Sequence, residues 1–90
     1  MPHISVKLFV GRDDATKLEL ARTLQAELGR VLGCGTEHVT VAVEDFTLDT
    51  WGDVYDREIK GNPHTLLPPS YDWDSEYLRM TGHPREHKKT

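Results

Sequence analysis

Two short segments of alternating apolar and polar residues, separated by one helical segment, constrain this chain more than any other feature. Residues 3–10 and residues 38–45 each alternate along their length, as half-buried strands do. Two such strands joined by a helix of roughly twenty residues form a βαβ unit with parallel strands and a right-handed crossover. We therefore predict an α/β (α+β) fold built from a β-α-β subunit.

The intervening helix is expected from about Asp14 to Leu32. Asp13 is a favourable N-cap, and Gly33 is placed to end the helix. Gly29 lies inside the helix, where glycine costs about 1 kcal/mol relative to alanine. The apolar residues that recur every three to four positions should pack on the strands; they are Leu18, Ala21, Leu24, Leu28, Val31 and Leu32.

The second half of the chain has weaker patterns. Asp49 and Thr50 can cap a short helix from Trp51 to about Ile59, and the proline-containing stretch 62–70 is typical of a loop. Residues 71–80 can form a further helical turn. We expect the polar tail, 81–90, to be mobile and solvated; it contains His83, Arg85, His87 and Lys88.

A two-stranded sheet with a helix on one face leaves its other face open, and parallel sheets normally have both faces covered. A domain of this size also buries only roughly 60–65% of the surface that its unfolded chain exposes. We therefore expect another copy of the chain to cover the open face and complete a larger sheet. The residues expected on that face are Ser5, Lys7, Phe9, Thr40 and Ala42.

Composition excludes several classes of function. The net charge is −4, which argues against nucleic-acid binding because such proteins carry a basic excess. The single cysteine rules out an internal disulfide framework, and the five histidines lack metal-ligand spacing. No apolar stretch is long enough to span a membrane, and no signal-peptide pattern is present. We expect a cytoplasmic protein that acts on a small molecule without metal or cofactor.

Pro2 carries the most specific chemistry. A small residue after Met1 permits removal of that methionine, so that the mature chain begins with the secondary amine of Pro2. An ordinary α-amino group has a pKa of about 7.7–8.0, and apolar burial or a neighbouring cation lowers it because both disfavour the ammonium. The neutral amine is a competent general base at pH 7.

Each of these residues also has a structural interpretation. Proline at position 2 is often not catalytic, and Arg12 by itself suits an exposed turn. The combination favours catalysis, because Pro2 opens a strand that ends at Gly11 and Arg12. His3 either tunes the amine or is a partly exposed strand residue, and Lys7 is either an extra cation for the site or an interfacial salt-bridge partner.

The order and spacing of these residues resemble the tautomerase superfamily, and in particular the 4-oxalocrotonate tautomerase-like proteins. The resemblance covers roughly residues 2–72, and the part from Trp51 to Tyr71 is similar to the longer, dimeric bacterial members. It is carried by Pro2-His3-Ile4, Val10-Gly11-Arg12, the acid-rich helix start, the segment from Val39 to Glu44, and Trp51.

This resemblance implies a tautomerase-like domain over 1–72, with 73–90 as a partly mobile C-terminal extension. It implies a homodimer rather than a hexamer, with Pro2 as the catalytic acid/base. Arg12 would bind the substrate carboxylate, often at a neighbouring subunit's site. Trp51 would wall the pocket, although it is equally suited to packing in a dimer core.

One position departs from the family pattern. The founding enzyme carries a second arginine where this chain has Thr40, which argues against a dicarboxylate substrate and for a monocarboxylate such as an arylpyruvate enol. The resemblance therefore implies keto–enol tautomerisation of a small 2-oxo acid or enol. The alternatives are a non-catalytic oligomeric binding protein on the same fold and a hydratase or dehalogenase of small unsaturated acids.

Overall fold

The structure is a computed structural model, and it describes residues 1–86. The chain divides into two compact units between Thr47 and Leu48. This division lies upstream of the boundary expected after residue 72, which stays a prediction. Residues 87–90, with His87 and Lys88 of the expected solvated tail, lie outside the described residues.

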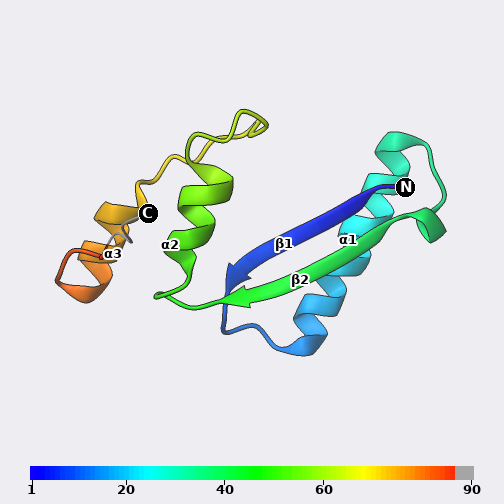
Figure 1. The fold of residues 1–90 in the computed structure, drawn as a ribbon. Coiled ribbons are helices and arrows are strands. Elements are labelled where there is room, and N and C mark those ends of the chain that lie inside the picture. The colour runs from blue at the N-terminus through cyan, green and yellow to red at the C-terminus, as the bar shows by residue number, and fades with distance from the viewer. Residues whose placement is uncertain (87–90) are drawn as a thin grey trace. The chain divides into compact units, whose positions relative to one another are not determined.

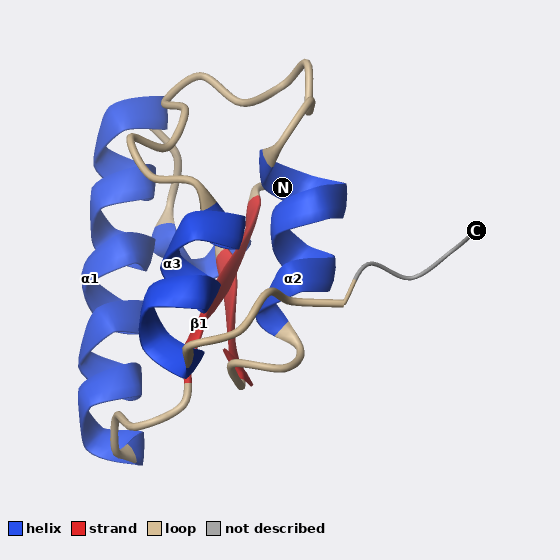
Figure 2. Ribbon diagram, turned by 90° about the vertical axis from the view of Figure 1, so that its left-hand side faces the viewer, coloured by secondary structure: helices blue, strands red, loops and turns tan. Residues whose placement is uncertain are grey.

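The first unit is the expected β-α-β arrangement. It consists of β1 (His3–Phe9), α1 (Asp14–Leu32), a short 3-10 turn η1 (Thr36–His38) and β2 (Thr40–Phe46). The strands run parallel, with His3 beside Thr40 at one end and Phe9 beside Phe46 at the other. Figures 1 and 2 show α1 lying along one face of this pair. The periodicity of the two strand segments thus predicted both their type and their direction.

The ends of α1 form as the sequence predicts. The Asp13 carboxylate accepts a hydrogen bond of 2.8 Å from the Thr16 amide. Hydrogen bonds from the Thr16 side chain and amide lower the pKa of Asp13. At the other end Gly33 adopts a left-handed conformation with φ of 68°, and its amide donates to the carbonyl of Gly29.

The part of α1 that packs on the two strands is narrower than the row of apolar residues along the helix. Val39, at the entry to β2, is only 2% exposed and forms the centre of this unit's core. Leu18, Val31 and Leu32 remain 51%, 64% and 58% exposed, so the expectation that they pack on the strands is wrong within one chain. Two strands about 5 Å apart are too narrow to cover the whole stripe of a helix about 10 Å wide.

Gly29 allows a close approach between α1 and the turn that leads into β2. A Cβ atom at this position would lie 3.0 Å from the carbonyl oxygen of Cys34 and 3.5 Å from the Thr36 methyl group. The Gln25 side-chain amide crosses the same gap, donating to the carbonyls of Thr36 at 3.1 Å and Val39 at 3.0 Å. These contacts fix where β2 begins, and therefore where Thr40 lies.

The second unit contains two helical segments. α2 (Trp51–Val54) continues into a π-helical turn, η2 (Tyr55–Ile59), and α3 (Trp73–Thr81) follows the proline-containing loop. Thr50 precedes α2 without making the expected capping bond to it, whereas Asp72 caps α3 by accepting from the Ser75 amide at 3.1 Å. Trp73, which is 2% exposed, lies at the core of this unit with Val54 and Tyr55.

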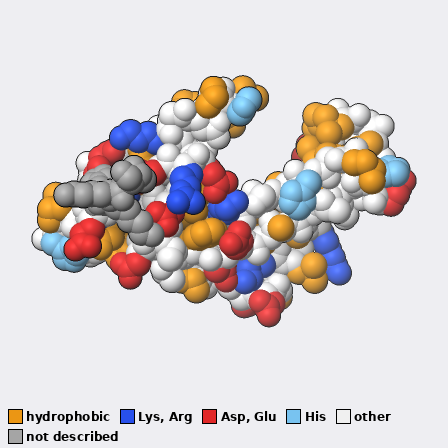
Figure 3. Space-filling view, viewed as in Figure 1, with side chains coloured by type: hydrophobic (Ala, Val, Ile, Leu, Met, Phe, Trp, Pro, Cys, Tyr) orange, Lys and Arg blue, Asp and Glu red, His pale blue; other side chains and the backbone are white. Residues whose placement is uncertain are grey.

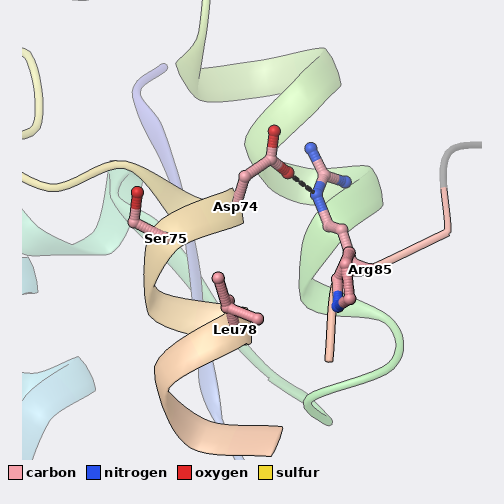
Figure 4. A pocket seen from close by; sticks show the side chains of 5 residues that line it. Asp74, Ser75, Leu78 and Arg85 are labelled. Atoms are coloured by element: carbon pink, nitrogen blue, oxygen red, sulfur yellow. Dashed lines mark hydrogen bonds and ion pairs between the residues drawn. The ribbon is translucent and has the colours of Figure 1, made fainter. Parts of the chain in front are cut away.

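Arg85 corrects the expectation of a freely solvated tail. Its side chain is 9% exposed, and it donates two bonds of 2.8 and 3.0 Å to Asp56. Its Nε atom donates to Asp74 on α3, as Figure 4 shows beside a pocket of about 290 Å³. The two carboxylates raise the pKa of Arg85. Glycine at position 52 leaves room for this guanidinium, because a Cβ there would lie 2.7 Å from it.

Gly29→Ala should lower the free energy of unfolding, by about 1 kcal/mol, even though alanine is the better helix former. The added methyl meets the Cys34 carbonyl, which belongs to the backbone of the helix-ending turn and yields little. Urea unfolding followed by circular dichroism measures the change. A more stable variant would show that the turn is free to move.

Arg85→Gln should destabilise the second unit by about 2 kcal/mol, because it leaves a guanidinium site between two carboxylates unfilled. Arg79→Gln is the matched control: its partner Glu76 is one turn away and Arg79 is 67% exposed, so its loss should cost less than about 0.5 kcal/mol. Tryptophan fluorescence during urea unfolding reports on this unit, which holds both tryptophans. Equal urea midpoints for the two variants would show that the ion pairs of Arg85 with Asp56 and Asp74 add no more stability than an exposed pair does.

Candidate active site

Pro2 lies immediately before β1, and its backbone is held by the neighbouring strand. The amide of Thr40 donates a hydrogen bond of 3.2 Å to the carbonyl of Pro2. Met1 is 98% exposed and precedes the strand. Removal of Met1 therefore costs β1 none of its pairing, and it leaves the amine of Pro2 at the end of an ordered strand.

His3 and Thr40 form a side-chain pair next to Pro2. They are partners in the strand register, and His3 Nδ1 lies 2.6 Å from Thr40 Oγ1. Both residues are exposed, on the face of the pair opposite to Ile4 and Val41. His3 is an exposed strand residue, and its bond to Thr40 is a contact that sequence patterns did not indicate. The influence of His3 on the amine stays a prediction.

Arg12 lies at the opposite end of β1 from Pro2. Its guanidinium donates a bond of 3.0 Å to the carbonyl of Phe9, the last residue of the strand. At about 3.3 Å per residue, β1 separates this guanidinium from His3 by roughly 20 Å. The partner of that bond is an uncharged carbonyl, so Arg12 keeps its positive charge for an anionic ligand.

Lys7 lies on the same face as His3, four residues further along β1. Its ammonium reaches back along the strand and donates a bond of 3.0 Å to the hydroxyl of Ser5. It therefore lies nearer to Pro2 than Arg12 does, about three residues, or roughly 10 Å, along the strand. Lys7 remains the alternative cation within one chain.

Trp51 belongs to the second unit, so its expected approach to Pro2 stays a prediction. Within its own unit it is half-buried at the start of α2. The indole Nε1 donates a bond of 3.3 Å to the hydroxyl of Tyr71, and the Tyr71 ring packs 5.7 Å from that of Tyr55. Sequence analysis did not foresee the bond between Trp51 and Tyr71, because no short-range pattern links residues twenty positions apart.

Residues 1–86 contain no group of three or more His, Cys, Asp or Glu side chains placed to hold a metal ion. In the same stretch, no helix combines the length and the apolar character that crossing a membrane requires. The first unit places Pro2 and the hydrogen-bonded side chains of His3 and Thr40 at one end of β1, and the guanidinium of Arg12 at the other.

Comparison with known proteins identifies relatives of this arrangement. The family model described as "Tautomerase enzyme" matches residues 2–57, a range that includes Pro2, Arg12 and Trp51. A protein of Xylella fastidiosa (strain 9a5c) named "Probable tautomerase" is 42% identical over 73 residues, which cover 79% of this chain and 89% of that protein.

Solved structures agree with this match. The 4-oxalocrotonate tautomerase homologue TTHB242 is 35% identical, with a TM-score of 0.53 over 57% of this chain and 81% of its own. TomN, a homologue in the tomaymycin biosynthetic pathway, is 34% identical, with a TM-score of 0.53 over 56% and 77%. The apo form of unfused 4-OT is 26% identical, with a TM-score of 0.54 over 69% and 92%. The predicted family and the predicted β-α-β fold are both confirmed.

Proposed function

Because this chain belongs to the tautomerase family, we propose that it catalyses keto–enol tautomerisation of small 2-oxo monocarboxylates, such as arylpyruvate enols, with Pro2 as the acid/base. The observation that carries the proposal is the position of Pro2. It directly follows an exposed Met1 and opens a strand whose neighbour holds its carbonyl. The amine would therefore be presented in a fixed place.

The proton transfer needs one group that first accepts and then donates. The neutral amine of Pro2 takes the hydroxyl proton of the enol, which leaves an enolate next to the substrate carboxylate. The resulting ammonium then gives the proton to C3, which forms the ketone and restores the neutral amine. Because the intermediate carries two negative charges, a guanidinium that binds the carboxylate lowers its energy.

Arg12 is the proposed guanidinium, and it comes from a second copy of the chain. A 2-oxo acid is far shorter than the roughly 20 Å that β1 places between Pro2 and the Arg12 of the same chain. We propose a homodimer in which the open faces of two strand pairs are covered, and the Arg12 of one copy serves the Pro2 of the other. Trp51 is the proposed apolar wall of the pocket, which would favour the neutral amine.

Blocking the amine of Pro2 tests the proposal most simply. A protein with an uncleaved N-terminal tag carries an amide at this position, and an amide nitrogen accepts no proton. We expect tautomerisation of phenylenolpyruvate, followed by ultraviolet absorbance, to fall at least 10²-fold. In the unblocked enzyme, kcat/KM should rise with pH as the ammonium loses its proton. A folded, blocked protein with the unblocked rate would exclude Pro2 as the base.

Arg12→Ala should lower kcat/KM about 10²-fold, as expected when a charge-assisted contact to a carboxylate is lost. Arg12→Lys should have a kcat/KM between those of the wild type and of Arg12→Ala, because lysine keeps the positive charge but cannot donate two parallel hydrogen bonds. Arg30→Ala is the control, since Arg30 pairs with Glu27 on the exposed side of α1. If Arg12→Ala keeps normal activity, Arg12 does not bind the substrate carboxylate and Lys7 becomes the candidate for that role.

A further inference from the structure

We infer that His3 and Thr40 bind the 2-oxo (enol) oxygen of the substrate as one hydrogen-bonding unit. The inference rests on the proposed function, because it places these side chains at the reaction that Pro2 would carry out. The family resemblance implies an arginine at the position of Thr40. We give the role of that arginine to the side chains of His3 and Thr40 together, without a second cation.

The position of the pair supports this role. His3 follows Pro2 directly in the chain, and the Thr40 backbone donates to the Pro2 carbonyl at 3.2 Å. The same two residues are register partners whose side chains meet at 2.6 Å. Pro2 and the pair are therefore tied to one another through both strands, and they lie at the same end of the strand pair.

Proton counting shows what the pair offers. A neutral imidazole has one N–H and a threonine hydroxyl has one O–H. Their mutual bond uses one of these two protons, whichever way it runs. If the hydroxyl donates to Nδ1, the Nε2–H of His3 remains free; if Nδ1–H donates, the hydroxyl proton of Thr40 remains free. One uncharged donor is thus available in either tautomer.

A single uncharged donor suits a ketone or enolate oxygen better than it suits a second carboxylate. A carboxylate taken from water needs a positive charge or several donors in compensation, whereas a developing enolate oxygen gains most from a fixed donor aimed at it. Other side chains on this face leave room there. Ala42 and Ser5 follow the pair in the register and are exposed, and Ser5 is engaged by Lys7.

A purely structural pair would behave differently. Exposed cross-strand pairs contribute little to stability, through packing and β-propensity. On that basis Thr40→Val should be tolerated better than Thr40→Ser, because valine keeps the β-branch and serine does not. The binding role predicts the reverse order for catalysis, since serine keeps the hydroxyl and valine lacks it.

The experiment measures kcat and KM for phenylenolpyruvate in Thr40→Val, Thr40→Ser, His3→Phe, His3→Gln and the His3→Phe/Thr40→Val double variant. Ser5→Ala, on the same face of β1, is the control. We expect Thr40→Val and His3→Phe each to lose about 10- to 100-fold, mainly in kcat, as when an oxyanion donor is removed. Thr40→Ser and His3→Gln should recover most of this loss, and the double variant should lose no more than about threefold beyond either single one.

Activity in Thr40→Val equal to or above that in Thr40→Ser would overturn the inference, and so would losses confined to thermal stability. The N-terminally blocked protein, measured in parallel, separates this failure from that of the proposed function. If blocking abolishes activity while the variants of His3 and Thr40 remain fully active, the role of Pro2 as the base is upheld, and His3 and Thr40 do not bind the substrate oxygen. If the blocked protein keeps its activity, the proposed function and the inference both fail.

Discussion

A seven-residue strand separates the amine at Pro2 from the guanidinium at Arg12, and the proposed chemistry depends on that separation. Pro2 is held at one end of β1 by the Thr40 amide, and Arg12 is held at the other by the Phe9 carbonyl. No small acid spans roughly 20 Å. A chain that uses both groups must therefore bring a second copy to the site, so assembly and catalysis become a single requirement.

The same strand pair gives a physical reason for that assembly. α1 covers one face of β1 and β2, and the other face carries exposed Ser5, Thr40 and Ala42. Leu18, Val31 and Leu32 are also exposed on α1, and Leu66 and Leu67 in the second unit. In the space-filling view, orange hydrophobic side chains reach the surface at several places (Figure 3). A monomer would leave this apolar area in water, at a cost proportional to the area.

Local patterns in the sequence predicted the elements well. Alternation predicted both strands, and the residues around Asp13 and Gly33 predicted both ends of α1. Two of the contacts that sequence analysis missed join distant positions. His3 meets Thr40 only because the parallel register aligns them, and Arg85 reaches Asp56 and Asp74 only because a turn after α3 brings it back.

Gly29 seemed unfavourable in a helix until its neighbour was known to be the Cys34 carbonyl. The proposed role of Trp51 rests on the family resemblance and not on a local pattern of the sequence.

Subunit mixing tests most directly whether Pro2 and Arg12 of different copies share one site. The N-terminally blocked protein, which keeps Arg12, is refolded together with an equal amount of Arg12→Ala protein, which keeps the amine of Pro2. Random pairing of equal amounts draws both intact groups into about a quarter of the sites, so the mixture should recover about a quarter of wild-type activity. A mixture no more active than the average of its two components would contradict a site shared between copies.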